Sequence, residues 1–402
     1  MKNIIVIGAG QAGQALCTEL RDKGYDGALT LIGAEAALPY QRPPLSKAYL
    51  LGEMDKERLY LRPNTYYDDA NITVRTNAQI NQIDPAAKTV IIGGEALPYD
   101  KLAITTGSTP RRLPAAVGGA LAGVFTVRDL ADVDAMAPYF KAGKRCLIVG
   151  GGYIGLEAAA VAAKRGVSVT LVEMGDRILQ RVAAPETSAL FRDIHTAHGV
   201  DIKEGTSLRT LHGSDHVTGA TLSDGREIDV DFVIAGIGIT PNSELAQAAG
   251  LTIDNGIAVN AHSQTSDPDI YAAGDCASFP YKEGRLRLES VPNAIDQAQN
   301  AARNMLGHNE AYHPKIWFWS DQYDIKLQIA GLNSGYTNVA TRRAEGGAVS
   351  FWYFNADQLI AVDAANDPRA YMVAKRLIEA GKTVDPATIE DPNTDLKALL
   401  RA

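Results

Sequence analysis

Two glycine-rich segments have the residue types and spacing to bind a charged ligand. The first begins at Gly8 and reads Gly-Ala-Gly-Gln-Ala-Gly, and the second begins at Gly150 and reads Gly-Gly-Gly-Tyr-Ile-Gly. In this pattern the first glycine permits a tight turn, the second lets backbone approach a pyrophosphate, and the third lets a helix pack closely on a strand. The N-terminus of that helix then faces the phosphate charge. Each segment therefore predicts a dinucleotide-binding turn.

The elements that must position these glycines are visible on both sides of each segment. An apolar run at 4–7 precedes the first segment and a similar run at 146–149 precedes the second, and each segment opens a helical pattern. A further strand pattern then leads to Glu35 in the first case and to Glu173 in the second. Both acids lie near the ~20-residue spacing expected of a carboxylate that accepts a ribose hydroxyl.

The repetition of this unit carries most of the inference. One such motif is weak evidence because glycine-rich turns are common, whereas two copies with strand, helix and spaced acid are specific. The alternative is a structural turn that happens to occur twice. Alternating strands and helices predict an α/β fold with parallel sheets. Two dinucleotide sites predict two different dinucleotides, because nicotinamide delivers a hydride that a flavin can accept. We therefore expect FAD in the first site and NAD(P)H in the second.

Composition excludes several other classes of protein. The chain has 402 residues, 46% of them hydrophobic, and a formal net charge of −8. That charge argues against a nucleic-acid or anionic-membrane partner, and the apolar runs are too short to span a membrane. The start of the chain is typical of a first strand and lacks the features of a signal peptide. We expect a cytoplasmic protein, as a monomer or homodimer.

Neither the cysteines nor the histidines indicate a metal or disulfide centre. Cys17, Cys146 and Cys276 are far apart in sequence and form no Cys-x-x-Cys pair. The histidine pairs at 195 and 198 and at 212 and 216 have no third ligand in evidence. We therefore expect no metal site, and we interpret the cysteines as small packing residues.

Longer segments carry a family resemblance. They are Pro-Pro-Leu-Ser-Lys-Ala-Tyr-Leu at 43–50, Thr-Thr-Gly at 105–107, the segments 150–157, 233–238, 273–275 and 289–294, and Trp-Phe-Trp-Ser-Asp-Gln at 317–322. The chain resembles the two-dinucleotide-binding flavoprotein reductases over nearly its whole length. Within them it is similar to the NADH-dependent ferredoxin reductases of bacterial cytochrome P450 and Rieske oxygenase systems. The first and last of these segments are specific to that subgroup.

The resemblance implies a glutathione-reductase-like α/β fold, with two Rossmann-like dinucleotide-binding domains and a C-terminal α+β domain. We expect a discontinuous FAD-binding domain at 1–109 and 239–310, an NAD-binding domain at 110–238 and a third domain at 311–402. In the third domain we expect strands at 325–329, 348–353 and 358–362, and a helix near 368–380.

The resemblance also implies which residues contact FAD. They are Gly8, Gly10, Ala12, Gly13, Glu35, Arg42, Lys47, Ile80, Thr106, Gly107, Arg128, Gly274, Asp275, Val291 and Trp319. Asp275 would bind the ribityl-phosphate portion, and Lys47 and Trp319 would lie near the isoalloxazine. The alternatives are a Gly-Asp turn, a solvated surface lysine and an aromatic core residue.

The residues implied for the nicotinamide dinucleotide are Gly150, Gly152, Ile154, Gly155, Glu157, Glu173, Gly236 and Gly238. Glu157 would pair with Lys47 beside the flavin, where the two would act as catalytic residues. The alternative for Glu157 is a surface acid in the first helical turn that complements the helix dipole. Glu173 favours NADH because a carboxylate repels a 2′-phosphate, although Arg177 and Arg181 keep NADPH open.

The electrons must then leave the flavin. Residues 39–50, where some relatives place a redox cysteine, contain none. The family implies a [2Fe-2S] ferredoxin as acceptor, and the cluster must lie on that partner because three cysteines cannot make a four-cysteine site. The candidate basic residues for docking are Lys282, Arg285, Arg287, Arg303, Lys315, Arg342 and Arg343. The rival hypotheses are reduction of rubredoxin, a quinone or oxygen, and a redox-sensing flavoprotein.

Overall fold

The computed structural model describes residues 1–401, and contacts divide them into two compact units. The first unit comprises Met1–Gln41, Asp55–Thr109 and Ile239–Lys315. The second comprises Arg42–Met54, Pro110–Gly238 and the chain from Ile316 onwards. The segment 42–54 thus belongs to a different unit from the residues on either side of it. The division into three domains expected from the sequence remains a prediction.

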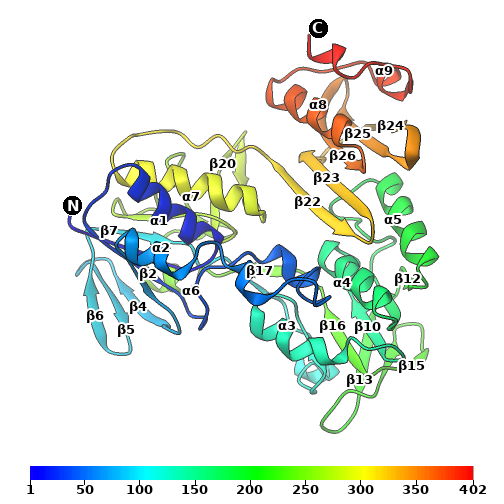
Figure 1. Ribbon diagram of the computed structural model, residues 1–402, viewed down its shortest axis with the longest axis horizontal. Coiled ribbons are helices and arrows are strands. Elements are labelled where there is room, and N and C mark those ends of the chain that lie inside the picture. The colour runs from blue at the N-terminus through cyan, green and yellow to red at the C-terminus, as the bar shows by residue number, and fades with distance from the viewer. Residues whose placement is uncertain (402) are drawn as a thin grey trace. The chain divides into compact units, whose positions relative to one another are not determined.

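A five-stranded parallel sheet forms the centre of the first unit. Its strands, in spatial order, are β19 (Ile270–Ala272), β7 (Lys101–Ile104), β1 (Asn3–Ile7), β2 (Ala28–Ile32) and β3 (Ile72–Arg75). Helices α1 (Gln11–Asp22) and α7 (Val291–Met305) lie side by side in this unit (Figure 1). The chain order changes direction between β1 and β7, which is where open α/β sheets bind ligands at the carboxyl ends of their strands.

The residues of β1 show why this sheet forms. All but the first are buried, and successive side chains enter different clusters. Ile4 and Val6 pack with residues of α1 and α7, whereas Ile5 and Ile7 pack on the other face. There they meet Ile83 of a three-stranded antiparallel sheet. That sheet consists of β4 (Ile80–Asp84), β5 (Thr89–Ile92) and β6 (Glu95–Pro98). The unbroken apolar run therefore reflects burial on both faces.

The second unit repeats the parallel sheet. Its order is β12 (Asp201–Lys203), β11 (Ser168–Val172), β10 (Arg145–Val149), β16 (Phe232–Ala235) and β9 (Val124–Phe125). The helices of this part are α3 (Leu130–Met136), α4 (Tyr153–Lys164) and α5 (Pro185–Ala197). A three-stranded antiparallel sheet joins β13 (Leu208–His212), β14 (Gly219–Leu222) and β15 (Glu227–Asp229). Both glycine-rich segments thus lie between a strand and a helix of a Rossmann-like sheet, as the sequence predicted.

The C-terminal part of the second unit is a five-stranded antiparallel sheet with two helices. The strand order is β22 (Trp317–Gln322), β23 (Ile325–Gly331), β26 (Gln358–Ala365), β25 (Val349–Asn355) and β24 (Asn338–Arg343). The helices are α8 (Pro368–Glu379) and α9 (Pro386–Glu390). The sequence predicted the three strands β23, β25 and β26, and α8, but not β22 and β24. The core of this part includes Trp352, Phe354 and Leu377.

Candidate functional site

The turn between β1 and α1 holds the helix against the sheet. A Cβ atom on Gly13 would lie 2.0 Å from the carbonyl oxygen of Gly8. Gly8 itself has a φ of +110°, and a Cβ there would lie 2.2 Å from the carbonyl oxygen of Thr105. Side chains at these two positions would separate α1 from β1 and β7. The first and third glycines of the segment are therefore required by close approach of backbone.

The middle glycine of this turn has a different environment. Apart from Gly10 and its two neighbours in the chain, no heavy atom of the described residues lies within 4 Å of the position that a Cβ on Gly10 would take. Gly10 is the N-cap of α1, and no side chain within residues 1–401 caps that helix. The space beside Gly10 is therefore open, and the first turn of α1 receives no side-chain cap from the described residues. An uncapped helix N-terminus beside a bare glycine fits a pyrophosphate, which is the part of FAD expected here.

Other predicted FAD residues of the first unit lie around the same turn. A Cβ on Gly274 would lie 3.2 Å from the Cβ of Ala12, so the segment after β19 lies against α1. The amide of Gly274 donates to Oε1 of the buried Gln297, at 2.9 Å. Asp275 follows, and its Oδ2 accepts a hydrogen bond of 2.8 Å from Ser108. Residues distant in the sequence therefore meet at the carboxyl ends of β1, β7 and β19.

The residues that follow β2 and β7 are held by defined partners. The hydroxyl of Tyr40 donates to Oε2 of Glu35 at 2.5 Å. Thr106 donates through Oγ1 to the carbonyl oxygen of Asn242 at 2.7 Å, and the Asn242 side-chain amide donates back to the Thr106 carbonyl at 2.9 Å. The Gly107 carbonyl accepts from the amide of Asn242, also at 2.9 Å. Asn242 thus fixes the segment that the sequence assigned to the flavin.

Two of the weaker assignments in this unit have structural roles of their own. Ile80 begins β4, is 8% exposed and belongs to the apolar cluster on the second face of the sheet. Val291 is the first residue of α7 and follows Ser290, whose side chain caps that helix. Their contacts with FAD remain predictions.

The turn between β10 and α4 repeats the first turn in its details. A Cβ on Gly155 would lie 2.1 Å from the Gly150 carbonyl oxygen, and a Cβ on Gly150 would lie 2.4 Å from the carbonyl oxygen of Gly236. At Gly152 the corresponding position has no heavy atom of the described chain within 4 Å. Gly152 is the N-cap of α4, and no side chain of residues 1–401 caps it. This turn also fits a pyrophosphate.

The acid after β11 is held by backbone. Oε2 of Glu173 accepts from the amide of Gly151 at 2.7 Å, and Oε1 accepts from the amide of Gly175 at 2.8 Å. The carboxylate is therefore tied to the glycine-rich turn, where its spacing from the glycines predicts a ribose hydroxyl. The side chain of Arg177 donates to Ser188 Oγ at 2.5 Å and to the carbonyl oxygen of Gln180 at 3.4 Å. Of the two arginines considered as possible partners of an NADPH 2′-phosphate, Arg177 thus binds other groups of the protein.

The remaining predicted NAD residues also border this turn. Ile154, the second residue of α4, is 46% exposed. Gly238 has a φ of +99°, and a Cβ there would lie 3.9 Å from Nη2 of Arg181. Arg181 therefore lies beside Gly238, at the edge of this turn.

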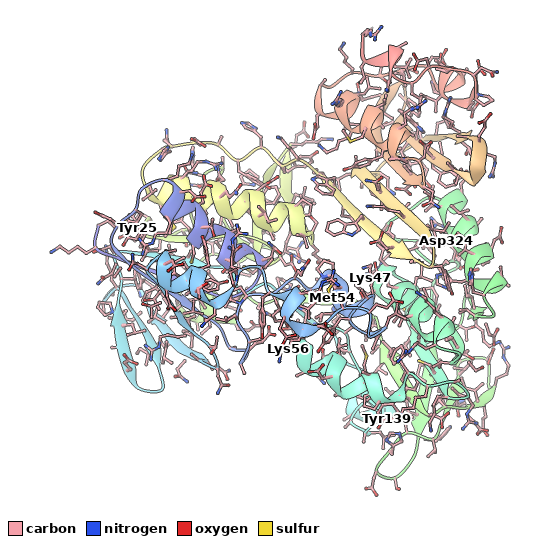
Figure 2. All side chains as sticks on the ribbon, viewed as in Figure 1. Tyr25, Lys47, Met54, Lys56, Tyr139 and Asp324 are labelled. Atoms are coloured by element: carbon pink, nitrogen blue, oxygen red, sulfur yellow. The ribbon has the colours of Figure 1, made fainter. Side chains whose placement is uncertain are left out.

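A buried ion pair joins the segment 42–54 to α4. Nζ of Lys47 lies 2.6 Å from Oε2 of Glu157, with 19% and 4% of the respective side chains exposed. The same oxygen accepts from Ser46 Oγ at 2.7 Å, and Oε1 accepts from Ser320 Oγ of β22, also at 2.7 Å. Figure 2 labels Lys47 on this segment. The pairing implied by the resemblance is therefore present, and three donors surround one carboxylate.

The position of Glu157 corrects one detail of the sequence analysis. Glu157 is the fifth residue of α4, beyond the first turn, and it is buried. The alternative of a solvated acid that complements the helix dipole is therefore wrong.

The structure brings together two further predicted flavin contacts of the second unit. Nη1 of Arg42 donates to the carbonyl oxygen of Arg128 at 2.7 Å. Trp319 is half-buried in β22, and its ring stacks on that of Trp317 with 5.8 Å between centroids. Of these residues only the two tryptophans lie in a segment quoted for the family resemblance, at 317–322.

The three cysteines are buried free thiols. Burial raises the pKa of Cys17 to about 12, and it also raises the pKa of Cys146 and of Cys276 above the ordinary thiol value. Such groups stay protonated near neutral pH, and the thiolate is the reactive form. Their interpretation as packing residues agrees with this burial.

The expected basic docking residues differ in exposure. Arg342 is buried, and its guanidinium donates to backbone carbonyls between Ile389 and Thr394. It holds the chain after α9, so its assignment to a docking surface is wrong. Arg303 is paired with Glu19 and Glu310. The exposed candidates include Lys282, Lys315 and Arg343.

Sequence reasoning missed the polar residues that support the ion pair. Ser46 and Ser320 lie inside the two segments that were quoted for the resemblance, and that adjacency was the available signal. His195 was considered only as a metal ligand.

Among residues 1–401, no group of three or more histidine, cysteine or acidic side chains is arranged to hold a metal ion. Within the same residues, no helix is long and apolar enough to cross a membrane.

Comparisons with known proteins show which families and relatives this chain resembles. The pyridine nucleotide-disulphide oxidoreductase family matches residues 2–298, and a reductase C-terminal family matches residues 317–400. Putidaredoxin reductase of Pseudomonas putida is 40% identical over 100% of this chain and 97% of its own. The 5,5'-dehydrodivanillate O-demethylase ferredoxin reductase subunit of a Sphingobium species is 40% identical over 99% and 98%. The solved covalent complex of putidaredoxin reductase with putidaredoxin matches with a TM-score of 0.96 and 39% identity, over 100% of this chain and 98% of that one.

The fold and the two glycine turns define an oxidoreductase with two dinucleotide sites. The chain belongs to the pyridine nucleotide-disulphide oxidoreductase family. The family, the α/β fold class and the use of FAD with a pyridine nucleotide, all predicted from the sequence, are confirmed.

Proposed function

We propose that this protein passes electrons from NADH through FAD to a [2Fe-2S] ferredoxin that supplies a cytochrome P450 or another oxygenase. The observation that carries the proposal is the pair of equivalent glycine turns, each with an open middle glycine at an uncapped helix N-terminus. The full-length similarity to a putidaredoxin reductase and to a demethylase's ferredoxin reductase subunit supports the choice of acceptor. A cytoplasmic location is part of the proposal, because NADH is supplied there.

FAD, when bound, supplies a centre that accepts a hydride pair and releases electrons singly. The chain's own residues bind the two dinucleotides and orient them. The backbone at Gly10 and the N-terminus of α1 would hold the FAD pyrophosphate, and Gly152 with α4 would hold that of the nicotinamide dinucleotide. Lys47 and Glu157 would provide one fixed cation and one fixed anion beside the reacting rings. Because the pair is buried, its electrostatic effect is stronger than that of a solvated pair.

The cysteines support a protein acceptor rather than a substrate reduced through a thiol. A thiol-based step needs an accessible thiolate, and burial keeps the thiols of Cys17, Cys146 and Cys276 protonated. Release of single electrons to a docked protein requires no thiol. Docking to an acidic ferredoxin would use exposed cations such as Lys282, Lys315 and Arg343.

The test of the acceptor compares two assays of the purified FAD-loaded protein. Cytochrome c reduction by NADH should depend on an added [2Fe-2S] ferredoxin, and the ferredoxin KM should rise with ionic strength because exposed charges are screened. A rate that is unchanged without ferredoxin, or equal with a quinone, rubredoxin or oxygen as acceptor, would contradict the proposal. A stable flavin–NAD complex with very slow turnover would instead favour a redox sensor.

The preference for NADH over NADPH is a second part of the proposal. It rests on the Glu173 carboxylate, which the amides of Gly151 and Gly175 hold at the edge of the second turn. Glu173→Gln should lower the NADH to NADPH ratio of kcat/KM by about tenfold, which corresponds to about 1.4 kcal/mol. Asp176→Asn is the matched control, since it removes a nearby exposed charge and should change the ratio less than twofold. A wild-type preference for NADPH would overturn this assignment.

A further inference from the structure

A chain of hydrogen bonds leads from the buried ion pair to α5. Ser320 Oγ donates to Oε1 of Glu157 at 2.7 Å, and Gln322 Nε2 donates to Ser320 Oγ at 3.1 Å. Oε1 of Gln322 lies 2.8 Å from Nε2 of His195, and the hydroxyl of Tyr323 lies 3.1 Å from Nδ1 of the same ring. Glu157 lies on α4 and His195 on α5, and β22 supplies Ser320 and Gln322. All of these residues belong to the second compact unit.

The direction of each bond follows from the chemistry of the groups. The Gln322 amide nitrogen is a donor, so its oxygen faces His195 and requires a hydrogen on Nε2 of that ring. A neutral ring protonated at Nε2 has an acceptor at Nδ1, which suits the Tyr323 hydroxyl. The Ser320 oxygen accepts from Gln322, so its own hydrogen is directed to Glu157. Every donor between His195 and Glu157 therefore points toward the carboxylate.

Burial makes the loss of any one of these hydrogen bonds costly. The residues at 195, 320 and 322 are at most 1% exposed, so water is not at hand to replace a lost partner. Burial also lowers the pKa of His195 to about 4, which keeps the ring neutral near neutral pH. The exposed His198, whose ring stacks on Tyr323, and Tyr323 itself are the titratable groups beside it. A primary amide does not exchange protons readily at such pH, so the chain can orient groups but is unsuited to conduct protons.

The side-chain amide of Gln322 can take two orientations, with either its nitrogen or its oxygen toward Ser320. If His195 offered no donor, the Gln322 side chain could turn over and present its oxygen to Ser320. The Ser320 hydroxyl has a single hydrogen, so that oxygen would compete with Oε1 of Glu157 for it. Whenever Ser320 donates to Gln322, Oε1 of Glu157 loses its bond from Ser320, while Lys47 and Ser46 still bind Oε2. The carboxylate would then be held through Oε2 alone, so its orientation and that of the Lys47 ammonium would be less tightly fixed.

We propose that His195 is a positioning residue for flavin reduction, which acts through Gln322 and Ser320 to fix the carboxylate of Glu157 and with it the Lys47 ammonium. This inference rests on the proposed function, because it assumes that the ion pair acts beside the flavin and the nicotinamide. His195 contacts neither cofactor in this proposal. A core histidine with satisfied hydrogen bonds would have the same burial, so the test must detect coupling to Glu157.

The first measurement concerns the ring itself and requires no turnover. Nitrogen-15 NMR of the FAD-loaded protein at pH 7 should show His195 neutral, with its hydrogen on Nε2. In Gln322→Met, where the oxygen partner is lost, that tautomer should no longer be fixed. A ring protonated at Nδ1 or charged at pH 7 in the wild type would overturn the proposal.

The second measurement is a double-mutant cycle on the limiting rate of flavin reduction at saturating NADH. His195→Phe keeps a ring but removes the donor, and it should lower this rate by roughly tenfold, as small misplacements of catalytic groups do. The NADH dissociation constant should change less than twofold. In a Glu157→Gln background, the same change at His195 should alter the rate less than twofold, because its target is already gone.

Controls separate positioning from loss of structure. His195→Gln restores a donor amide and should recover the rate to within about threefold of wild type. His216→Phe makes the same chemical change at a histidine whose Nε2 bonds to the Asp231 carbonyl at 3.0 Å, and it should leave the rate unchanged. If His195→Phe does not fold, Ser320→Ala breaks the chain at its other end and should give the same tenfold loss. Equal losses in the wild-type and Glu157→Gln backgrounds would refute the coupling, whereas failure of the wild type to be reduced by NADH would refute the proposed function.

Discussion

Removal of one partner from the Lys47–Glu157 pair should be much more harmful than removal of the other. Glu157 is 4% exposed, whereas 19% of the Lys47 side chain reaches solvent. Lys47→Met leaves a charged carboxylate in the interior, with only the hydroxyls of Ser46 and Ser320 as donors. Glu157→Gln leaves an ammonium that keeps the Pro43 carbonyl at 3.3 Å and can turn toward water.

The expected magnitudes follow from these surroundings. Stripping the partner from a buried charge costs about 3–5 kcal/mol, and the two remaining hydroxyls place Lys47→Met near the lower end, at about 3 kcal/mol. Glu157→Gln should cost about 1 kcal/mol, because it exchanges charge-assisted bonds for neutral ones around a group of the same size. The double variant Lys47→Met/Glu157→Gln should also cost about 1 kcal/mol, since it buries no unpaired charge.

Thermal unfolding of the FAD-loaded protein, followed by circular dichroism, measures these differences. For a cooperative unit of about 150–250 residues, 3 kcal/mol corresponds to a Tm decrease of roughly 6–12 °C. The Lys47→Met variant should therefore unfold well below both the Glu157→Gln variant and the double variant. Flavin absorbance checks that each sample carries the same amount of FAD. Equal and additive losses from the two single variants would refute the account of a buried, mutually dependent pair.

Two further predictions concern the glycine turns and a buried acid. Gly10→Ala and Gly152→Ala each add a methyl group at a position that other parts of the described chain leave open to 4 Å, so both proteins should fold normally. Gly10→Ala should lose FAD on dilution, whereas Gly152→Ala should keep FAD and raise the NADH KM about tenfold. The opposite pair of effects would reverse the assignment of the two sites. Burial raises the pKa of Asp363 to about 6, although Thr187 and Tyr353 donate to it. Because the unfolded value is lower, at about 3.9, this acid stabilises the fold below that value, and the contribution is lost as pH rises through 6. Asp363→Asn should therefore gain stability relative to wild type by up to about 3 kcal/mol between pH 4 and pH 7, seen as a pH-dependent Tm difference, and a constant difference would contradict the assignment.

The sequence predicted the α/β class and both dinucleotide turns because local rules govern them. A glycine such as Gly13 is required wherever a helix must start against a strand, and the steric reason is contained within a few residues of chain. The burial of β1 on both faces likewise follows from its unbroken apolar run. The strands β22 and β24 were not predicted, because β22 places three aromatic residues before three polar ones and β24 is mostly polar, so neither fits an alternating or a buried strand.

The placement of polar residues could not be predicted in the same way. Arg342 looks like a surface charge in the sequence, and only the fold shows that it binds carbonyls after α9. The segment 42–54 is continuous in sequence with the first unit, yet its contacts lie in the second. Asn242 holds Thr106 and Gly107 across more than a hundred residues of chain.

The sequence by itself determined what the chain can bind, because glycine spacing and the strand–helix alternation are local properties that specify a pyrophosphate turn. The tertiary structure decided how the charges are used. Glu157, Ser46, Ser320 and His195 come from four separate elements, and their meeting depends on long-range packing of α4, α5 and β22. Whether a carboxylate is solvated or buried among three donors is a property of that packing, and no periodicity in the sequence records it.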